Sequence, residues 1–124
     1  MSRTPASTLQ HQFSDPEVRT AEACRLLSHP ARIQLLLALS ERGTCACADL
    51  VEASPLAQPT VSQHLKALRE AGLIAPQALG NRVCYTLSPP GRDALLAQLQ
   101  PLLSKLQAWQ PDDVNCTPLS DTCC

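Results

Sequence analysis

Apolar residues recur every three or four positions over most of this chain, which is the spacing of one face of an α-helix. From residue 73 to 87 the spacing changes, because Val83, Tyr85 and Leu87 alternate with more polar residues. This alternation predicts a two-stranded β-hairpin that turns at a Gly-Asn pair. The helical stretches that the pattern predicts are residues 17–28, 28–43, 44–54, 57–72 and 88–109. We therefore expect a mostly α fold with one small β-hairpin.

The ends of the predicted helices carry capping signals. Ser28 or His29 can cap the second helix, and Gly43 ends it. Thr44 is a possible cap for the third helix, and Pro101 should kink or divide the last one. The residues expected to pack in the core from the first two helices are Ala23, Cys24, Leu27, Ile33, Leu36, Leu37 and Leu39.

Length and composition favour a single helical domain. The 124 residues suffice for one core, and 44% of them are hydrophobic although only three are aromatic. We divide the chain into a flexible arm at 1–16, one domain at 17–109 and a disordered tail at 110–124. No signal-like segment and no apolar run of about 20 residues is visible, so we expect a cytoplasmic protein that does not contact membranes.

Positively and negatively charged residues are concentrated in different parts of the chain. The formal net charge of −1 argues against a protein that coats nucleic acid by bulk electrostatics. Residues 58–92 nevertheless carry four Lys or Arg against one Glu, a net charge of +3, and the tail is acidic. A local basic face is therefore expected within 58–92.

The order of the predicted elements is that of a winged helix-turn-helix. A short helix, a turn and an amphipathic helix precede the hairpin, and Val61, Leu65 and Leu68 should face inward from the amphipathic helix. Outward polar groups suit base edges and phosphates. The expected DNA-binding residues are Gln58, Thr60, Ser62, Gln63, His64, Lys66, Arg69, Asn81 and Arg82. The alternatives are an ordinary solvated helix and a winged helix used only for protein contacts.

The segments "LLSHPARIQLLLAL", "ADLVEASPLAQPTVSQHLKALREAGLI" and "GNRVCYTLSPPG" resemble the ArsR/SmtB family of winged-helix repressors, over residues 17–108. The resemblance implies a homodimer, joined through the first and last helices, that binds a palindromic operator and releases it when an ion binds. It places Ser62 and His64 in the family's recognition-helix motif. Ala57 stands where many members have Ser, so this helix should be less well capped.

A leucine stripe on the last helix supports dimerisation independently of the resemblance, although burial within one chain is the alternative. Two recognition helices in a two-fold dimer would lie about 34 Å apart, one turn of DNA. The expected dimer residues are Leu95, Leu99, Leu102, Leu103 and Leu106.

The chain has seven cysteines, an odd number, which makes a disulfide framework a poor explanation in a reducing compartment. Thiolates are soft ligands that suit arsenite, antimonite or a soft divalent ion. The resemblance places the paired cysteines of arsenite, cadmium and lead sensors near Cys45 and Cys47. The family's zinc site on the last helix uses Asp and His, and residues 89–109 contain Asp93 but no His. That zinc site is therefore expected to be absent.

The predicted thiol site is incomplete. Residues two apart do not share a face of a regular helix, so Cys45 and Cys47 can chelate together only if the first helical turn is irregular. A pyramidal arsenic site needs a third sulfur, which Cys84 or the tail could supply. At about 3.3 Å per residue the tail reaches about 23 to 45 Å beyond Trp109. The tail candidates are Cys116, Cys123 and Cys124.

We predict a transcriptional repressor that releases operator DNA when thiolates ligate As(III) or Sb(III), with no organic cofactor. A cadmium, lead or zinc sensor and a thiol-redox sensor of the same fold are the alternatives. A thiol-based arsenate reductase would need a phosphate-type anion loop or a catalytic CxxC, and the sequence has neither. We therefore do not expect an enzyme.

Overall fold

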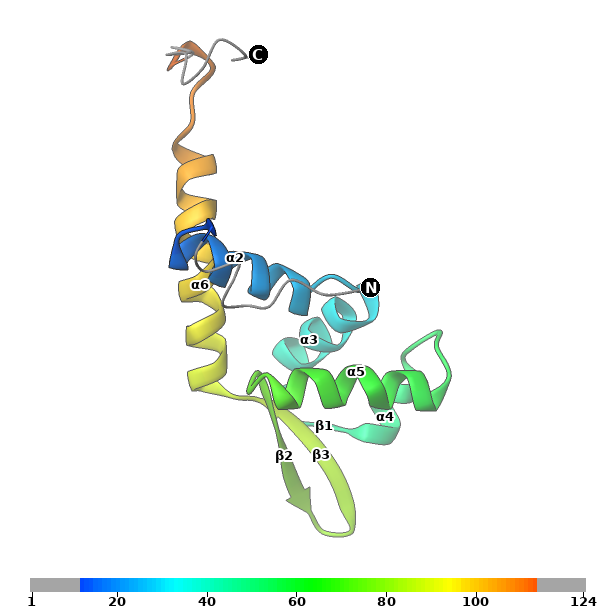
Figure 1. Ribbon diagram of the computed structural model, residues 1–124. Coiled ribbons are helices and arrows are strands. Elements are labelled where there is room, and N and C mark those ends of the chain that lie inside the picture. Colours follow the sequence, from blue (N-terminus) through cyan, green and yellow to red (C-terminus); the bar gives the residue numbers. More distant parts are fainter. Residues whose placement is uncertain (1–11, 114–124) are drawn as a thin grey trace.

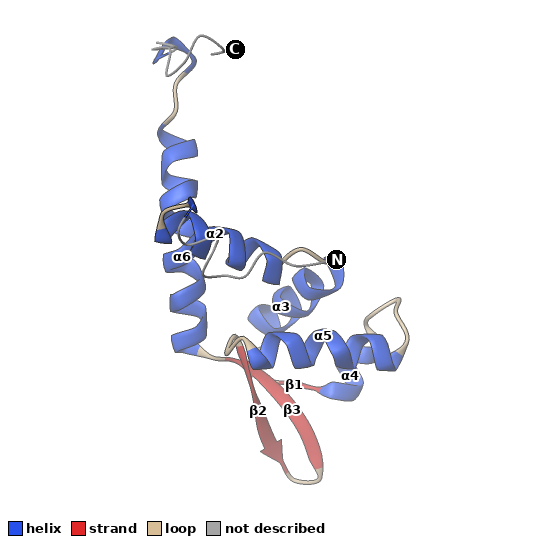
Figure 2. Ribbon diagram, in the orientation of Figure 1, coloured by secondary structure: helices blue, strands red, loops and turns tan. Residues whose placement is uncertain are grey.

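The computed structural model describes residues 12–113. It is mostly helical with one small antiparallel sheet, which confirms the predicted class (Figure 2). The long helices end within two residues of the predicted bounds. The elements are α2 Asp15–Leu26, α3 Pro30–Arg42, β1 Cys45–Ala46, α4 Cys47–Glu52, α5 Gln58–Glu70, β2 Ile74–Leu79, β3 Arg82–Leu87, α6 Pro89–Ala108 and a 3₁₀ turn, η1 Pro111–Asp113.

The core lies where α3, α4 and α5 pack against the sheet, whose strand order is β1-β3-β2 (Figure 1). From α5, Val61, Leu65 and Leu68 are buried as the 3.6-residue period predicts. From α3 and α4, Leu39 and Leu50 complete the centre of the cluster. Each such side chain contributes about 1.5 to 3 kcal/mol by burial, so this cluster holds α5 against the rest of the domain.

Two predictions about the first helices are wrong. Ile33 and Leu37 remain 39% and 55% exposed, and Leu35, which the prediction omitted, is buried on α3 instead. Cys24 is exposed although it was expected to be buried beside Ala23. Consecutive apolar residues fit more than one helix face, and adjacent positions differ by about 100° around the axis. The orientation of the helix therefore depends on its packing partners.

The stretch 44–54 is not one helix. Cys45 and Ala46 are extended and pair with β3, where Cys45 lies opposite Tyr85 and Ala46 lies opposite Cys84. The helix starts only at Cys47, after Ala46 with φ −65° and ψ 143°. The pairing partner is almost 40 residues away in the chain, so the local pattern did not reveal this third strand. The two-stranded hairpin itself is confirmed.

Helix α2 crosses α6, and beyond the crossing α6 extends away from the domain (Figure 1). The Thr20 hydroxyl donates to the carbonyl oxygen of Gln98 at 2.7 Å. Pro101 does not divide α6, which continues to Ala108.

The predicted arm and tail both contribute ordered residues at their inner ends. Helix α2 starts at Asp15, so the last two residues of the predicted arm belong to it, and the backbone N–H of Ser14 donates to Glu17 Oε2 at 3.3 Å. The 3₁₀ turn at Pro111–Asp113 lies in the predicted tail. The remaining residues of the arm and tail, 1–11 and 114–124, lie outside the described residues.

The start of α6 lies against the turn that follows α5. Ser88 N–H donates to the carbonyl of Leu73 at 3.0 Å, and a Cβ on Gly91 would overlap the backbone of Gly72 and Leu73. We expect Gly91→Ala to lower the free energy of unfolding by about 1 to 3 kcal/mol, because backbone atoms cannot yield as a side chain can. Urea denaturation at one protein concentration, followed by circular dichroism, measures this. Helix propensity alone would raise stability, so an unchanged or raised midpoint contradicts the steric argument.

Candidate DNA interface and thiol site

Helices α4 and α5 form the two helices of a helix-turn-helix, and the β2–β3 hairpin extends beside them (Figure 1). With its apolar side in the core, α5 presents its polar side outward. Asn81 and Arg82 are exposed at the hairpin turn. The exposed residues of α5 are Gln58, Gln63, Lys66 and Arg69, and the partly exposed ones are Thr60, Ser62 and His64. The predicted DNA-binding residues are thus confined to one helix face and the hairpin tip.

The contacts that these polar residues make with one another are weak. Gln58 Nε2 donates to Ser62 Oγ at 3.1 Å, and Lys66 Nζ lies 3.9 Å from Glu70 Oε1. Such exposed pairs contribute little stability, so the side chains are free to bind another partner. No side chain of the described residues caps α5 at Ala57, which confirms the predicted weaker cap. Thr60 N–H donates to the carbonyl oxygen of Ala57 at 3.0 Å and Pro59 has no N–H, so in the first turn only the amide of Gln58 is left for water or an anion.

The side chain of His64 contacts two residues at the start of α3. Arg32 Nε donates to His64 Nδ1 at 3.1 Å, and the imidazole rings of His29 and His64 lie 4.3 Å apart. Partial burial, and then the neighbouring His29 and Arg32, lower the pKa of His64 from its usual value, which favours the neutral imidazole. The sequence analysis missed the roles of His29 and Arg32, since nothing local links α3 to α5.

The extended backbone changes the expectation for the paired cysteines. Alternate side chains of an extended segment point to the same side, so Cys45 and Cys47 can share a side without any distortion of a helix. Both pack with the core cluster; Cys45 is 4% exposed and Cys47 is partly exposed. Cys45 Sγ lies 4.0 Å from the carbonyl oxygen of Ala38. The four cysteines of the described chain, which include Cys24 and Cys84, are all free thiols.

A third ligand does not join this pair within residues 12–113. In that range no three His, Cys, Asp or Glu side chains form a group suited to a metal ion. Cys84 pairs with Ala46 and therefore points to the sheet face opposite Cys45. Asp93 of α6 is hydrogen-bonded to Arg92 at 3.0 Å. The tail candidates Cys116, Cys123 and Cys124 lie outside the described residues.

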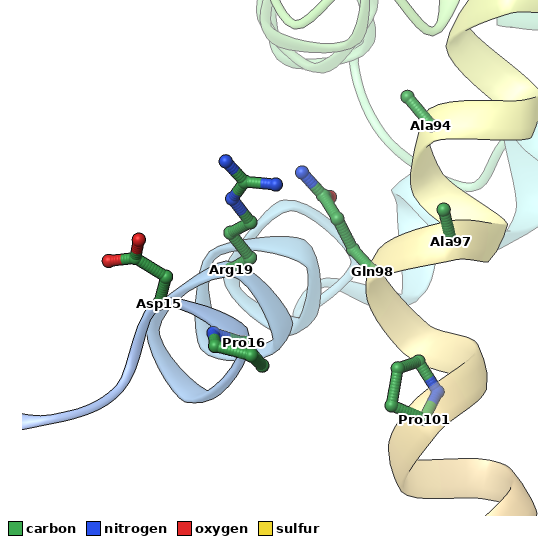
Figure 3. Close-up of a pocket in the computed structure, with 7 residues that line it drawn as sticks. All are labelled: Asp15, Pro16, Arg19, Ala94, Ala97, Gln98 and Pro101. Atoms are coloured by element: carbon green, nitrogen blue, oxygen red, sulfur yellow. The ribbon is translucent and has the colours of Figure 1, made fainter.

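A pocket of about 430 Å³ lies between α2 and α6 (Figure 3). Its lining combines one carboxylate, one guanidinium and one side-chain amide with alanine and proline side chains. The lining residues are Asp15, Pro16, Arg19, Ala94, Ala97, Gln98 and Pro101. Because it offers neither thiol nor imidazole, this pocket does not suit a soft ion.

An apolar stripe remains uncovered on α6. Leu95 and Leu99 are half-buried, whereas Leu102 and Leu106 are 45% and 63% exposed, and Leu103 is exposed as well. Within residues 12–113 no residue of α6 is fully buried, although Leu95 packs against the core cluster. Exposed apolar surface of this extent is typical of an interaction site. In the part of the chain that the structure describes, no helix is both long and apolar enough to span a bilayer.

A helix-turn-helix that presents polar groups beside a hairpin with an exposed arginine defines a winged helix-turn-helix DNA-binding domain. Residues 29–75 match the family model for bacterial regulatory proteins of the arsR family. The chain belongs to this arsR family, as its relatives also show. The proteins it resembles are regulators of transcription and not enzymes.

Three similar proteins illustrate the relationship. The SmtB repressor of Mycobacterium tuberculosis is 42% identical over 67 residues, which cover 54% of this chain and 49% of that protein. The arsenic resistance regulator ArsR1 of Pseudomonas putida is 30% identical, with 72% of this chain and 70% of that protein covered. The crystal structure of a possible transcriptional regulator for arsenical resistance is 31% identical, with a TM-score of 0.57, and covers 73% of this chain and 88% of its own. The match thus spans about half the length of the SmtB repressor.

Proposed function

We propose that this protein is a transcriptional repressor that binds operator DNA as a homodimer and releases it when arsenite or antimonite is ligated by cysteine thiolates. One observation carries the proposal: Cys45 lies in the short strand that pairs with the hairpin strand β3, and Cys47 begins α4, which packs on α5. A ligand at these sulfurs therefore acts on both DNA-reading elements. The name of the Pseudomonas putida relative supports arsenic as the signal.

The proposed DNA contacts are of two kinds, those with phosphates and those with base edges. Lys66, Arg69 and Arg82 are exposed cations that suit phosphates. Hydroxyl, amide and imidazole groups suit base edges in the major groove, and α5 carries these at Thr60, Ser62, Gln63 and His64. A regulator that binds a bacterial chromosome acts in the cytoplasm, where we place this protein.

The homodimer would cover the leucine stripe of α6. Leu102, Leu103 and Leu106 lie on the part of the helix that extends beyond α2, with Trp109 exposed after its end. Pairing two such stripes buries apolar surface that one chain leaves in water. A two-fold arrangement brings two α5 helices to successive major grooves, about 34 Å apart.

Ligation at the thiol site balances as an exchange on arsenic. Each thiol proton leaves with an As–OH hydroxide as water, and each As–S bond replaces one As–O bond. Cys45 is buried, so it reaches an ion only if the segment moves away from the core. That movement would disturb the pairing with β3 and the support of α5. We assign the third sulfur to Cys116, Cys123 or Cys124, because Cys84 points to the other sheet face.

The test is fluorescence anisotropy with a duplex selected by the protein from a random-sequence library. We expect salt-dependent, sequence-specific binding that arsenite or antimonite weakens by about 5- to 150-fold, the usual range of allosteric coupling. Release by cadmium, lead or zinc alone would identify a divalent-ion sensor. Release by peroxide that dithiothreitol reverses, without any ion, would identify a redox sensor. Absence of salt-dependent DNA binding contradicts the whole proposal.

A further inference from the structure

The imidazole of His64 on α5 accepts a hydrogen bond from α3, and this bond determines which ring nitrogen carries the proton. Arg32 Nε lies 3.1 Å from His64 Nδ1. A guanidinium is always protonated and can only donate, so Nδ1 must be the acceptor and the hydrogen of the neutral ring must lie on Nε2. Arg32 is itself anchored, since its second donor bonds the carbonyl oxygen of Leu26 at 3.1 Å.

His29 reinforces this arrangement. Its Nδ1 accepts the backbone N–H of Ala31 at 3.0 Å as the cap of α3, so its proton also lies on Nε2. The ring of His29 lies 4.3 Å from that of His64. Protonating Nδ1 of His64 would set a donor against Arg32 Nε and add a charge beside the guanidinium. The contact with Arg32 thus favours the neutral ring of His64.

The free side of the His64 ring is available to a partner. No hydrogen bond to His64 Nε2 is made within residues 12–113, and no side-chain nitrogen or oxygen buried in that range lacks a partner. The unbonded Nε2–H therefore reaches solvent, from a residue on the polar side of α5. A helix in the major groove would present this group to the bases.

We propose that Arg32 is a positioning residue that fixes His64 as an obligate hydrogen-bond donor, so that α5 selects a base-edge acceptor at this position. The inference rests on the proposed function. Guanine O6 and N7, adenine N7 and thymine O4 are acceptors in the major groove, whereas the exocyclic amine of cytosine is a donor. Cytosine facing His64 should therefore be disfavoured by about fivefold to tenfold, as expected for one directed hydrogen bond.

Two measurements test the proposal. Nitrogen-15 NMR of the histidine rings at neutral pH should show wild-type His64 as the Nε2–H tautomer. Arg32→Met should give a mixture of tautomers, and duplexes selected by it should admit cytosine at the position that the wild type restricts. Arg69→Met is the matched control, because it removes an exposed arginine of α5 without touching His64. It should keep the tautomer and the base preference while binding all duplexes more weakly.

A second variant, His64→Gln, tests the base preference independently if Arg32→Met does not fold. His64→Gln places both a donor and an acceptor at this position, so its selected duplexes should also admit cytosine. A wild-type Nδ1–H tautomer, or an unchanged base preference in both variants, overturns the proposal. A wild-type protein that binds no duplex overturns the proposed function and the base preference together, whereas the NMR spectrum still reports on the Arg32–His64 bond.

Discussion

We expect arsenite not to release DNA from a Cys45→Ala, Cys47→Ser double variant, whereas it should weaken wild-type binding by about 5- to 150-fold. Cys45 lies in the strand that pairs with β3 and Cys47 is the first residue of α4, so the two sulfurs stand two residues apart where these elements join. Alanine suits the buried position and serine the partly exposed one, so the ion-free variant should fold and bind DNA. Anisotropy on the selected duplex, titrated with arsenite, measures the response.

Two further variants test which cysteines the arsenite response requires. Cys24→Ser removes an exposed thiol far from the segment along the chain and should leave the arsenite response intact. A chain that ends at Gln110 lacks Cys116, Cys123 and Cys124, and its response should be weakened because only two sulfurs remain for a pyramidal ion. Full release from the double variant would show that the segment is not the sensor. Full release from the shortened chain would remove the tail as the source of the third sulfur.

We expect Leu102→Glu combined with Leu106→Glu to convert the proposed dimer to a monomer and to lower its affinity for the selected duplex by about 100-fold or more. Both leucines are largely exposed within one chain, so the change leaves its core intact. A dimer interface would bury the added carboxylates without partners. Two linked DNA-binding units gain about 10²- to 10⁴-fold over one, and separation of the subunits forfeits this gain.

The matched control adds the same charge elsewhere on the helix. Gln100→Glu with Gln107→Glu alters two exposed positions of α6 beside the leucine stripe and should remain dimeric. Sedimentation equilibrium gives the oligomeric state, and anisotropy gives the affinity. A leucine variant that stays dimeric with unchanged DNA binding would mean that α6 does not form the interface.

The cysteine pair and the helix predicted around it show which features the sequence could predict and which it could not. The family resemblance placed Cys45 and Cys47 where metalloid and soft-ion sensors carry paired cysteines, and the softness of thiolates suggested the class of ion. The helix predicted around them was wrong, because Cys45 and Ala46 pair with a strand distant in the chain. The correction favours the proposed site, since the extended segment lets both side chains share one side.

Helix α3 and the contacts of His64 show what local sequence patterns could not predict. The three consecutive leucines that follow Ile33 and Gln34 predicted the helix but left its rotation open, and Ile33 and Leu37 are exposed. Likewise, the polar pattern of α5 predicted that His64 faces away from the core. Only the packing of α3 against α5 revealed that Arg32 and His29 hold the ring.

The sequence by itself determined the four long helices, the hairpin, the inward residues of α5 and the family resemblance, because each depends on neighbours a few positions apart. The tertiary structure alone decided the β1 pairing, the side chains that α3 buries, the exposure of the α6 leucines and the tautomer of His64. Each of these depends on contacts between segments that are distant in the chain, where backbone pairing and core packing override local propensity.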